Sequence, residues 1–106
     1  MKYKLTDEKI KHNDKTLYRI QALKDFGNVK AGDLGGWIQS ETSLSQNGDC
    51  WVYDEARIFG NARVFGNAKV FDNAWVYDTA QVYGYARVYD DAQVYGDTEI
   101  KNGFIT

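Results

Sequence analysis

Cysteine and histidine, which often act as nucleophile, general base or metal ligand, are scarce in this sequence. The chain has one cysteine, Cys50, and one histidine, His12. A structural zinc site needs about four ligands, mainly Cys and His, so this composition argues against zinc. A Cys–His nucleophile pair would need a third group to orient the histidine, and none is evident. The sequence therefore predicts no catalytic residue, no cofactor and no metal site, and a protein that is not an enzyme.

The surroundings of these two residues also favour structural roles. Cys50 lies two positions before Val52, where later repeats carry alanine, so we expect a small core residue. His12 stands beside the turn residues Asn13 and Asp14, and we expect it on the surface.

Acidic residues recur at an interval of 18 positions in the second half of the chain. If 18 residues made one circuit of a coil, their carboxylates would stack along one edge at about 4.8 Å. Asp and Asn are ordinary bend residues, and hydrated carboxylates need no ligand. A cation site and an anionic edge that competes with a nucleic-acid backbone stay open as alternatives. The acidic edge consists of Asp54, Glu55, Asp72, Asp90 and Asp91.

Repeats of six residues must position these side chains. Aliphatic residues stand six apart from Val52 to Ile100, and most have an alanine two positions earlier. Because side chains alternate across a strand, the Ala and Val positions share the inner face, and the residues between them point outward with the aromatics. The remaining pairs are mostly Gly, Asn and Asp, which tolerate bends. A three-sided coil encloses the apolar stripe completely, whereas a meander leaves it uncovered.

The spacing of Val64 with Ala68, and of Val70 with Ala74, resembles the hexapeptide-repeat left-handed parallel β-helix. The resemblance implies an all-β triangular solenoid with 18 residues per turn, and it implies the winding hand. That family includes acyltransferases with a catalytic His near a subunit boundary. His12 lies before the repeats, so a degenerate acyltransferase is retained only as an alternative.

The length of 106 residues fits a single domain, 1–106. We expect a β-rich N-terminal cap at 1–31, a transition coil with a loop at 32–50, and regular coils at 51–106. The cap would cover the strand edges at one end of the solenoid. A net charge of −2 disfavours general nucleic-acid binding. The single thiol and the lack of a long apolar run predict a cytoplasmic protein, in the host cytoplasm if it is phage-encoded.

Aromatic residues fall into outward columns if a turn has 18 residues. Stacked rings stabilise neighbouring strands, but so many exposed rings also indicate an interface. We expect a homo-oligomer, a dimer or trimer, through Phe59, Trp75, Tyr77 and Tyr95. We expect a protein partner on the face formed by Tyr53, Asp54, Glu55, Phe71, Asp72, Tyr89, Asp90 and Asp91.

The segment VKAGDLGGWI, followed by Val-Tyr-Gly-Asp words, resembles small hexapeptide-repeat proteins of phage and prophage genomes. The resemblance implies an inhibitor of a bacterial defence complex, such as an anti-CRISPR protein. Rings would anchor it and carboxylates would steer it onto an immune effector with a basic groove. Two further alternatives are a self-assembling structural solenoid and a nucleotide-sequestering protein. In the latter, the phosphate partners would be Arg57, Arg63 and Arg87.

Overall fold

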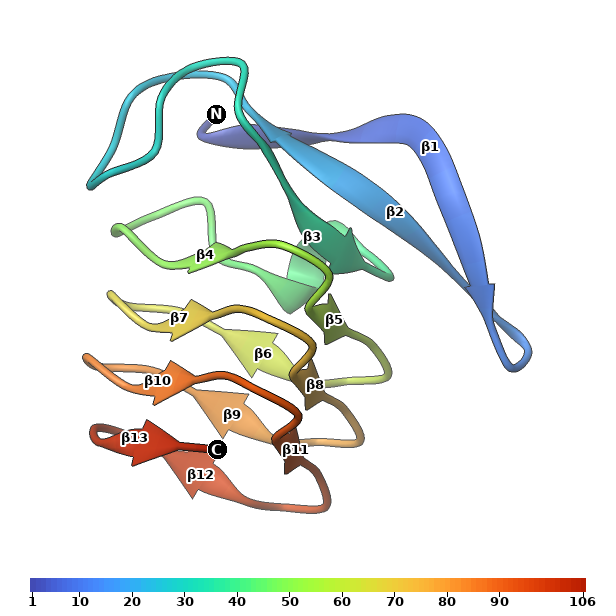
Figure 1. Ribbon diagram of the computed structural model, residues 1–106, viewed down its shortest axis with the longest axis vertical. Helices are drawn as coiled ribbons and strands as arrows, with labels where there is room; N and C mark the ends of the chain where they lie inside the picture. The colour runs from blue at the N-terminus through green and yellow to red at the C-terminus, as the bar shows by residue number, and fades with distance from the viewer.

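Strands of only two residues, joined by bends, make up most of the chain in the computed structural model, which describes residues 1–106 (Figure 1). Each hexad contributes one such strand, because the backbone leaves the strand pairing at each corner. The ten short strands are β4 (Trp51–Val52), β5 (Arg57–Ile58), β6 (Arg63–Val64), β7 (Lys69–Val70), β8 (Trp75–Val76), β9 (Gln81–Val82), β10 (Arg87–Val88), β11 (Gln93–Val94), β12 (Glu99–Ile100) and β13 (Phe104–Ile105).

Every third strand pairs in parallel, so each coil takes three strands. Trp51 pairs with Lys69, and Lys69 pairs with Arg87, which confirms the circuit of 18 residues. In Figure 1 the chain runs to the right through β4 and β7 at the front and to the left through β6 and β9 behind, while it descends. This path is left-handed. The fold is therefore the predicted triangular left-handed β-solenoid.

The interior of the solenoid holds the alanine and aliphatic positions of the hexads. Val70, Ala74 and Val76 have no exposed surface, as the alternation of side chains predicts. The corners carry Gly or Asp with positive φ, such as Asp72 at 59° and Gly66 at 69°. Asp tolerates this conformation because its short side chain forms local hydrogen bonds.

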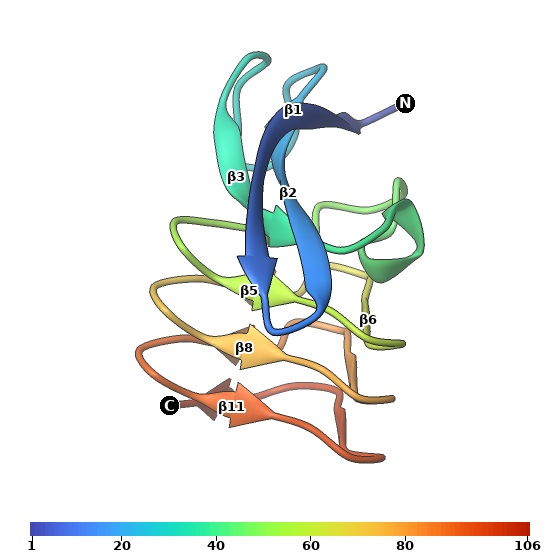
Figure 2. The ribbon, with the colours of Figure 1, turned by 90° about the vertical axis from the view of Figure 1, so that its right-hand side faces the viewer.

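The N-terminal cap is an antiparallel hairpin of β1 (Tyr3–His12) and β2 (Lys15–Ala22). Strand β3 (Leu34–Ile38) pairs antiparallel with β2 and parallel with β5, so the cap and one solenoid face form one sheet. A short 3-10 helix, η1 (Glu41–Ser43), follows. Figure 2 shows the hairpin lying over the β5 and β8 face.

The first coil is closed from above by Lys2 and Tyr3. The Lys2 Nζ donates to the carbonyls of Cys50 at 2.8 Å and Gly48 at 3.2 Å. The Tyr3 hydroxyl donates to the Leu44 carbonyl at 2.6 Å. Backbone oxygens that would be orphaned at this end thus have partners. Cys50 is fully buried among them, which confirms it as a core residue.

No helix in the structure is long and apolar enough to cross a lipid bilayer.

Candidate ligand-binding groove

The acidic edge forms as predicted, and the structure gives it a structural role. The Asp54 carboxylate accepts a hydrogen bond from the Asp72 backbone N–H at 3.1 Å, and Asp72 accepts one from Asp90 at 3.1 Å. Each side chain therefore caps the backbone of the coil below it. Glu55 accepts from the Trp37 indole and from Arg19, both at 3.1 Å, and these contacts lower the pKa of Glu55. No three His, Cys, Asp or Glu side chains here are arranged to hold a metal ion.

The predicted aromatic columns are also present. Phe71 and Tyr89 stack with ring centroids 5.0 Å apart, and Phe65 and Tyr83 stack at 4.8 Å, with nearly parallel planes in both pairs. Such pairs on neighbouring strands each contribute about 0.2 to 1 kcal/mol.

One column is covered by the hairpin, which corrects the expectation for His12. Its ring lies 4.3 Å from the Phe59 centroid and 4.4 Å from that of Trp75, and only 8% of His12 is exposed. The Arg57 guanidinium donates to its Nδ1 at 2.8 Å. His12 is thus an internal contact of the hairpin rather than a surface turn residue, because a tip of the cap reaches the β5 and β8 face.

The same contact changes the expected oligomer face. Phe59 is buried with Leu17 and Trp37 in a small apolar cluster, so it offers little free surface to a second subunit. Trp75 and Tyr77 are half-buried, and Tyr95 is exposed. An interface through these three residues stays a prediction.

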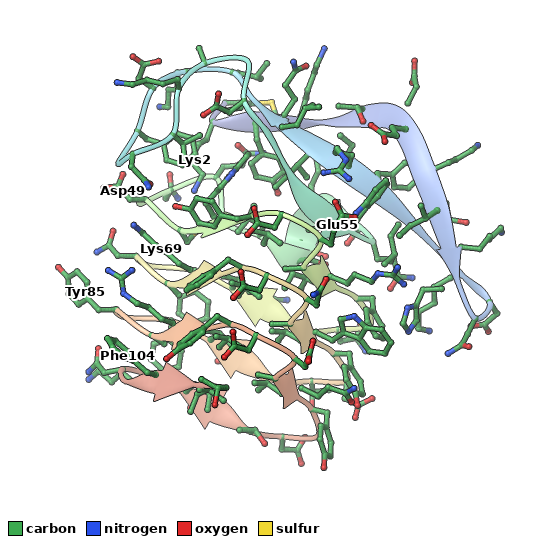
Figure 3. All side chains as sticks on the ribbon, viewed as in Figure 1. Lys2, Asp49, Glu55, Lys69, Tyr85 and Phe104 are labelled. Atoms are coloured by element: carbon green, nitrogen blue, oxygen red, sulfur yellow. The ribbon has the colours of Figure 1, made fainter.

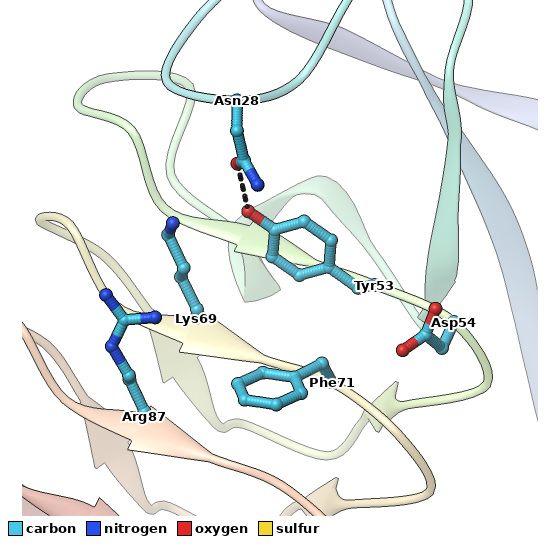
Figure 4. A pocket seen from close by; sticks show the side chains of 6 residues that line it. All are labelled: Asn28, Tyr53, Asp54, Lys69, Phe71 and Arg87. Atoms are coloured by element: carbon cyan, nitrogen blue, oxygen red, sulfur yellow. Dashed lines mark hydrogen bonds between the residues drawn. The ribbon is translucent and has the colours of Figure 1, made fainter.

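A groove lies beside the acidic edge, on the face formed by β4, β7 and β10 (Figure 4). It consists of two adjoining cavities of about 220 and 270 Å³, and both are lined by Lys69 and Arg87. We call it the Lys69–Arg87 groove. The other residues of the first cavity are Asn28, Tyr53, Asp54 and Phe71, and those of the second are Gly27, Asp49, Asn67 and Tyr85.

The floor of the groove carries two cations, Lys69 and Arg87, that form no ion pair, although Asp54 and Asp49 line the same cavities. Lys69 and Arg87 are register partners on β7 and β10, so their side chains leave the same face one above the other. The ion pairs of the chain involve only Lys15 and Arg19 as cations, so neither floor residue is in one. Two cations on neighbouring strands are suited to bind an anion with several oxygens.

A tight turn of the cap roofs the groove. The backbones of Phe26 and Val29 exchange hydrogen bonds of 3.0 and 2.8 Å, Val29 is buried, and Phe26 packs on Trp51. These contacts anchor both ends of the turn. At its tip, the Oδ1 of Asn28 accepts a hydrogen bond from the Tyr53 hydroxyl at 2.9 Å (Figure 4).

The sequence assigned some of these residues to other surfaces and missed others. Tyr53, Asp54 and Phe71 were predicted in the partner face, and they line the groove. Asn28 was missed, because only the folding of the cap brings residue 28 over β4. Arg57, Arg63 and Arg87 were predicted as joint phosphate partners, but they lie on β5, β6 and β10, which belong to three different sheets.

Lys69, Tyr85 and Phe104 lie along the edge of the solenoid opposite Glu55 (Figure 3). Tyr85 and Phe104 are 71% and 70% exposed, so the second cavity of the groove opens beside an uncovered aromatic ring.

Parts of the chain are similar to known repeat proteins. The YdcK β-solenoid repeat family matches residues 56–70 and 80–96. A stretch of 42 residues, 40% of this chain, is 52% identical to the uncharacterized acetyltransferase YdcK of Escherichia coli (strain K12). The match spans 13% of the length of that relative.

These similarities correct one expectation from the sequence. The absence of familiar catalytic residues predicted that the protein is not an enzyme, and the similarity to a protein named an acetyltransferase contradicts this. They agree with a hexapeptide-repeat β-helix and do not bear on a phage origin or an anti-CRISPR role.

Proposed function

We propose that the chain binds a phosphate-bearing acyl donor, of the acetyl-coenzyme A type, in the Lys69–Arg87 groove and serves acetyl transfer. The observation that carries the proposal is the pair of cations that share one groove and form no ion pair. The name of the Escherichia coli relative supports the choice of an acyl donor among phosphate-bearing ligands.

The shape of the groove suits such a donor. Phosphate oxygens would lie between Lys69 and Arg87, where charge-assisted hydrogen bonds are strongest. A flat base would lie against Phe71 in the first cavity, and the rest of the donor would pass through the second cavity toward Tyr85. The rings are held by stacking on neighbouring coils, so the site is formed before the ligand arrives.

The groove would bind the acyl donor, and His12 would take no part in proton transfer. The imidazole lies on the β5 and β8 face, packed between Phe59 and Trp75, whereas the groove lies on the β4, β7 and β10 face.

Calorimetric titration with acetyl-coenzyme A tests the proposal. We expect binding that weakens with added salt, and about 10-fold weaker binding for Lys69→Gln and for Arg87→Gln. Arg63→Gln is the matched control, because Arg63 is exposed on another sheet. The proposal fails if the wild-type protein does not bind the donor, or if Arg87→Gln binds it as tightly as Arg63→Gln does.

A second candidate function is protein binding, and the exposure of Tyr85, Tyr95 and Phe104 favours it. The partner would be a second copy of the chain or a protein with a basic groove, such as the immune effector expected from the sequence. Light scattering at tens of micromolar and affinity capture with Tyr95→Ala test it. A strict monomer would exclude the homo-oligomer, and capture that Tyr95→Ala leaves unchanged would exclude this face.

A further inference from the structure

We infer that Asn28 determines the specificity of the Lys69–Arg87 groove by donating to a phosphate oxygen from above, so that the groove selects a nucleoside phosphate in one orientation. The inference rests on the proposed function, because it concerns the same groove. Beyond that function, it names the phosphate as the recognised group, Asn28 as the residue that recognises it, and a single orientation for the ligand.

The side-chain amide of Asn28 is fixed by its neighbours. Its Oδ1 is occupied by the Tyr53 hydroxyl at 2.9 Å, and the turn that carries it is anchored through Phe26 and Val29. The Nδ2 forms no hydrogen bond within the chain, so its two N–H donors are free at the cavity wall. Burial raises the pKa of Tyr53, which keeps its hydroxyl protonated as the donor to Asn28.

Hydrogen-bond donors face one another across the first cavity, while the carboxylates of Asp54 and Asp49 line the first and the second cavity respectively. Lys69 and Arg87 supply charged N–H groups from the floor, and Asn28 supplies amide N–H groups from the roof. A tetrahedral phosphate, whose oxygens only accept when it is ionised, satisfies donors on opposite sides at once. A planar carboxylate, with two oxygens in one plane, would leave the roof or part of the floor unsatisfied.

The opposite end of the first cavity has the reverse polarity. Asp54 lines it, and one of its carboxylate oxygens already accepts from the Asp72 backbone N–H, which leaves the other as a free acceptor. An anionic group is repelled there, and a hydroxyl or amine is favoured. A nucleoside phosphate would then lie with its phosphate at Lys69 and Arg87 and its base against Phe71. Its hydroxyl or amine groups would point toward Asp54.

Titrations followed by NMR, with adenosine 5′-monophosphate and adenosine as probes, test this inference. Asn28→Asp has the same shape and reverses the polarity of the roof, and Asn28→Ala removes the donors without adding charge. Asn61→Asp is the matched control, because it adds the same charge at an exposed corner away from the groove. Thermal unfolding of each variant establishes that it is folded.

We expect the monophosphate to bind about 10-fold more weakly to Asn28→Asp and about 3-fold more weakly to Asn28→Ala. Adenosine should bind all variants within about 2-fold, because the ring contacts are unchanged. The inference is overturned if the wild-type protein does not bind the monophosphate, or if folded Asn28 variants bind it as the wild type does.

The two failures can be told apart. If acetyl-coenzyme A binds and the Asn28 variants are unaffected, the inference falls and the proposed function stands. If acetyl-coenzyme A does not bind but the monophosphate binds in an Asn28-dependent way, the acyl-donor proposal falls and the phosphate site stands.

Discussion

The contact of His12 with the solenoid predicts a large and pH-dependent effect of replacing this residue. His12→Ala removes two aromatic contacts, with Phe59 and Trp75, and the hydrogen bond from Arg57. Aromatic pairs contribute about 0.5 to 1.5 kcal/mol each, and a hydrogen bond to a charged group about 1.5 kcal/mol or more. The contributions are not fully additive, so we expect the free energy of unfolding to fall by about 2 to 3 kcal/mol at pH 7.

The sign of the pH dependence follows from the surroundings of the imidazole. Burial, and then the positive charges of Arg57 and Lys15, lower the pKa of His12 below its usual 6.5. The unfolded chain therefore binds the proton more readily than the folded protein does. The stabilisation is complete above about pH 6.5, and it is lost as the pH falls through the folded-state pKa. The cost of His12→Ala should accordingly shrink between pH 7 and pH 5.

Urea unfolding followed by tryptophan fluorescence measures this effect, since Trp75 lies against His12. Lys11→Ala is the matched control, because Lys11 precedes His12 on the same strand and is exposed. A cost below about 0.5 kcal/mol at pH 7, as expected for surface substitutions, would refute the docking of the hairpin. A cost that grows toward pH 5 would refute the assigned protonation state.

Two further substitutions test the closure of the first coil. Gly48→Ala should destabilise the protein by about 2 kcal/mol or more, because Gly48 has φ +72° and an added Cβ would lie 2.3 Å from the Gly66 carbonyl oxygen. Gly96→Ala, with a similar φ of +64° and open space around it, is the control, and equal melting temperatures would contradict the close approach. Lys2→Met should cost about 1 to 3 kcal/mol, because the carbonyls of Cys50 and Gly48 lose their buried donor. Lys4→Met, at an exposed position, is its control in the same urea assay, and equal stability of the two variants would contradict the capping role.

The periodicity of the sequence was sufficient to predict the solenoid and the order of residues along its faces. A period of six fixes which side chains point inward, and a circuit of three hexads fixes which residues stack. The same rule places Lys69 in one column with Arg87, on the face that carries Tyr53 and Phe71. The acidic edge followed for the same reason.

The cap could not be predicted to the same depth, because its contacts with the coils join residues far apart in the sequence. His12 and Arg57 are 45 positions apart, and Asn28 and Tyr53 are 25 apart. No spacing rule links such pairs, since they depend on the length and bend of the hairpin. Reading His12 as a surface turn residue was reasonable from its neighbours and wrong because the hairpin tip folds back onto Phe59.

The cap also decides which outward column is open to a ligand. The hairpin covers Phe59, and the Phe26–Val29 turn roofs the Tyr53 column and converts a ladder of rings into a groove. Lys69 and Arg87 lie within the residues that match the YdcK β-solenoid repeat family, whereas Asn28 lies outside them. Proteins that share only these repeats should therefore retain anion binding at the floor and lose the preference for phosphate that Asn28 provides. Asn28→Ala in this chain should reproduce that loss. The monophosphate should bind more weakly, while the fold and the Lys69 and Arg87 side chains of the floor are unchanged.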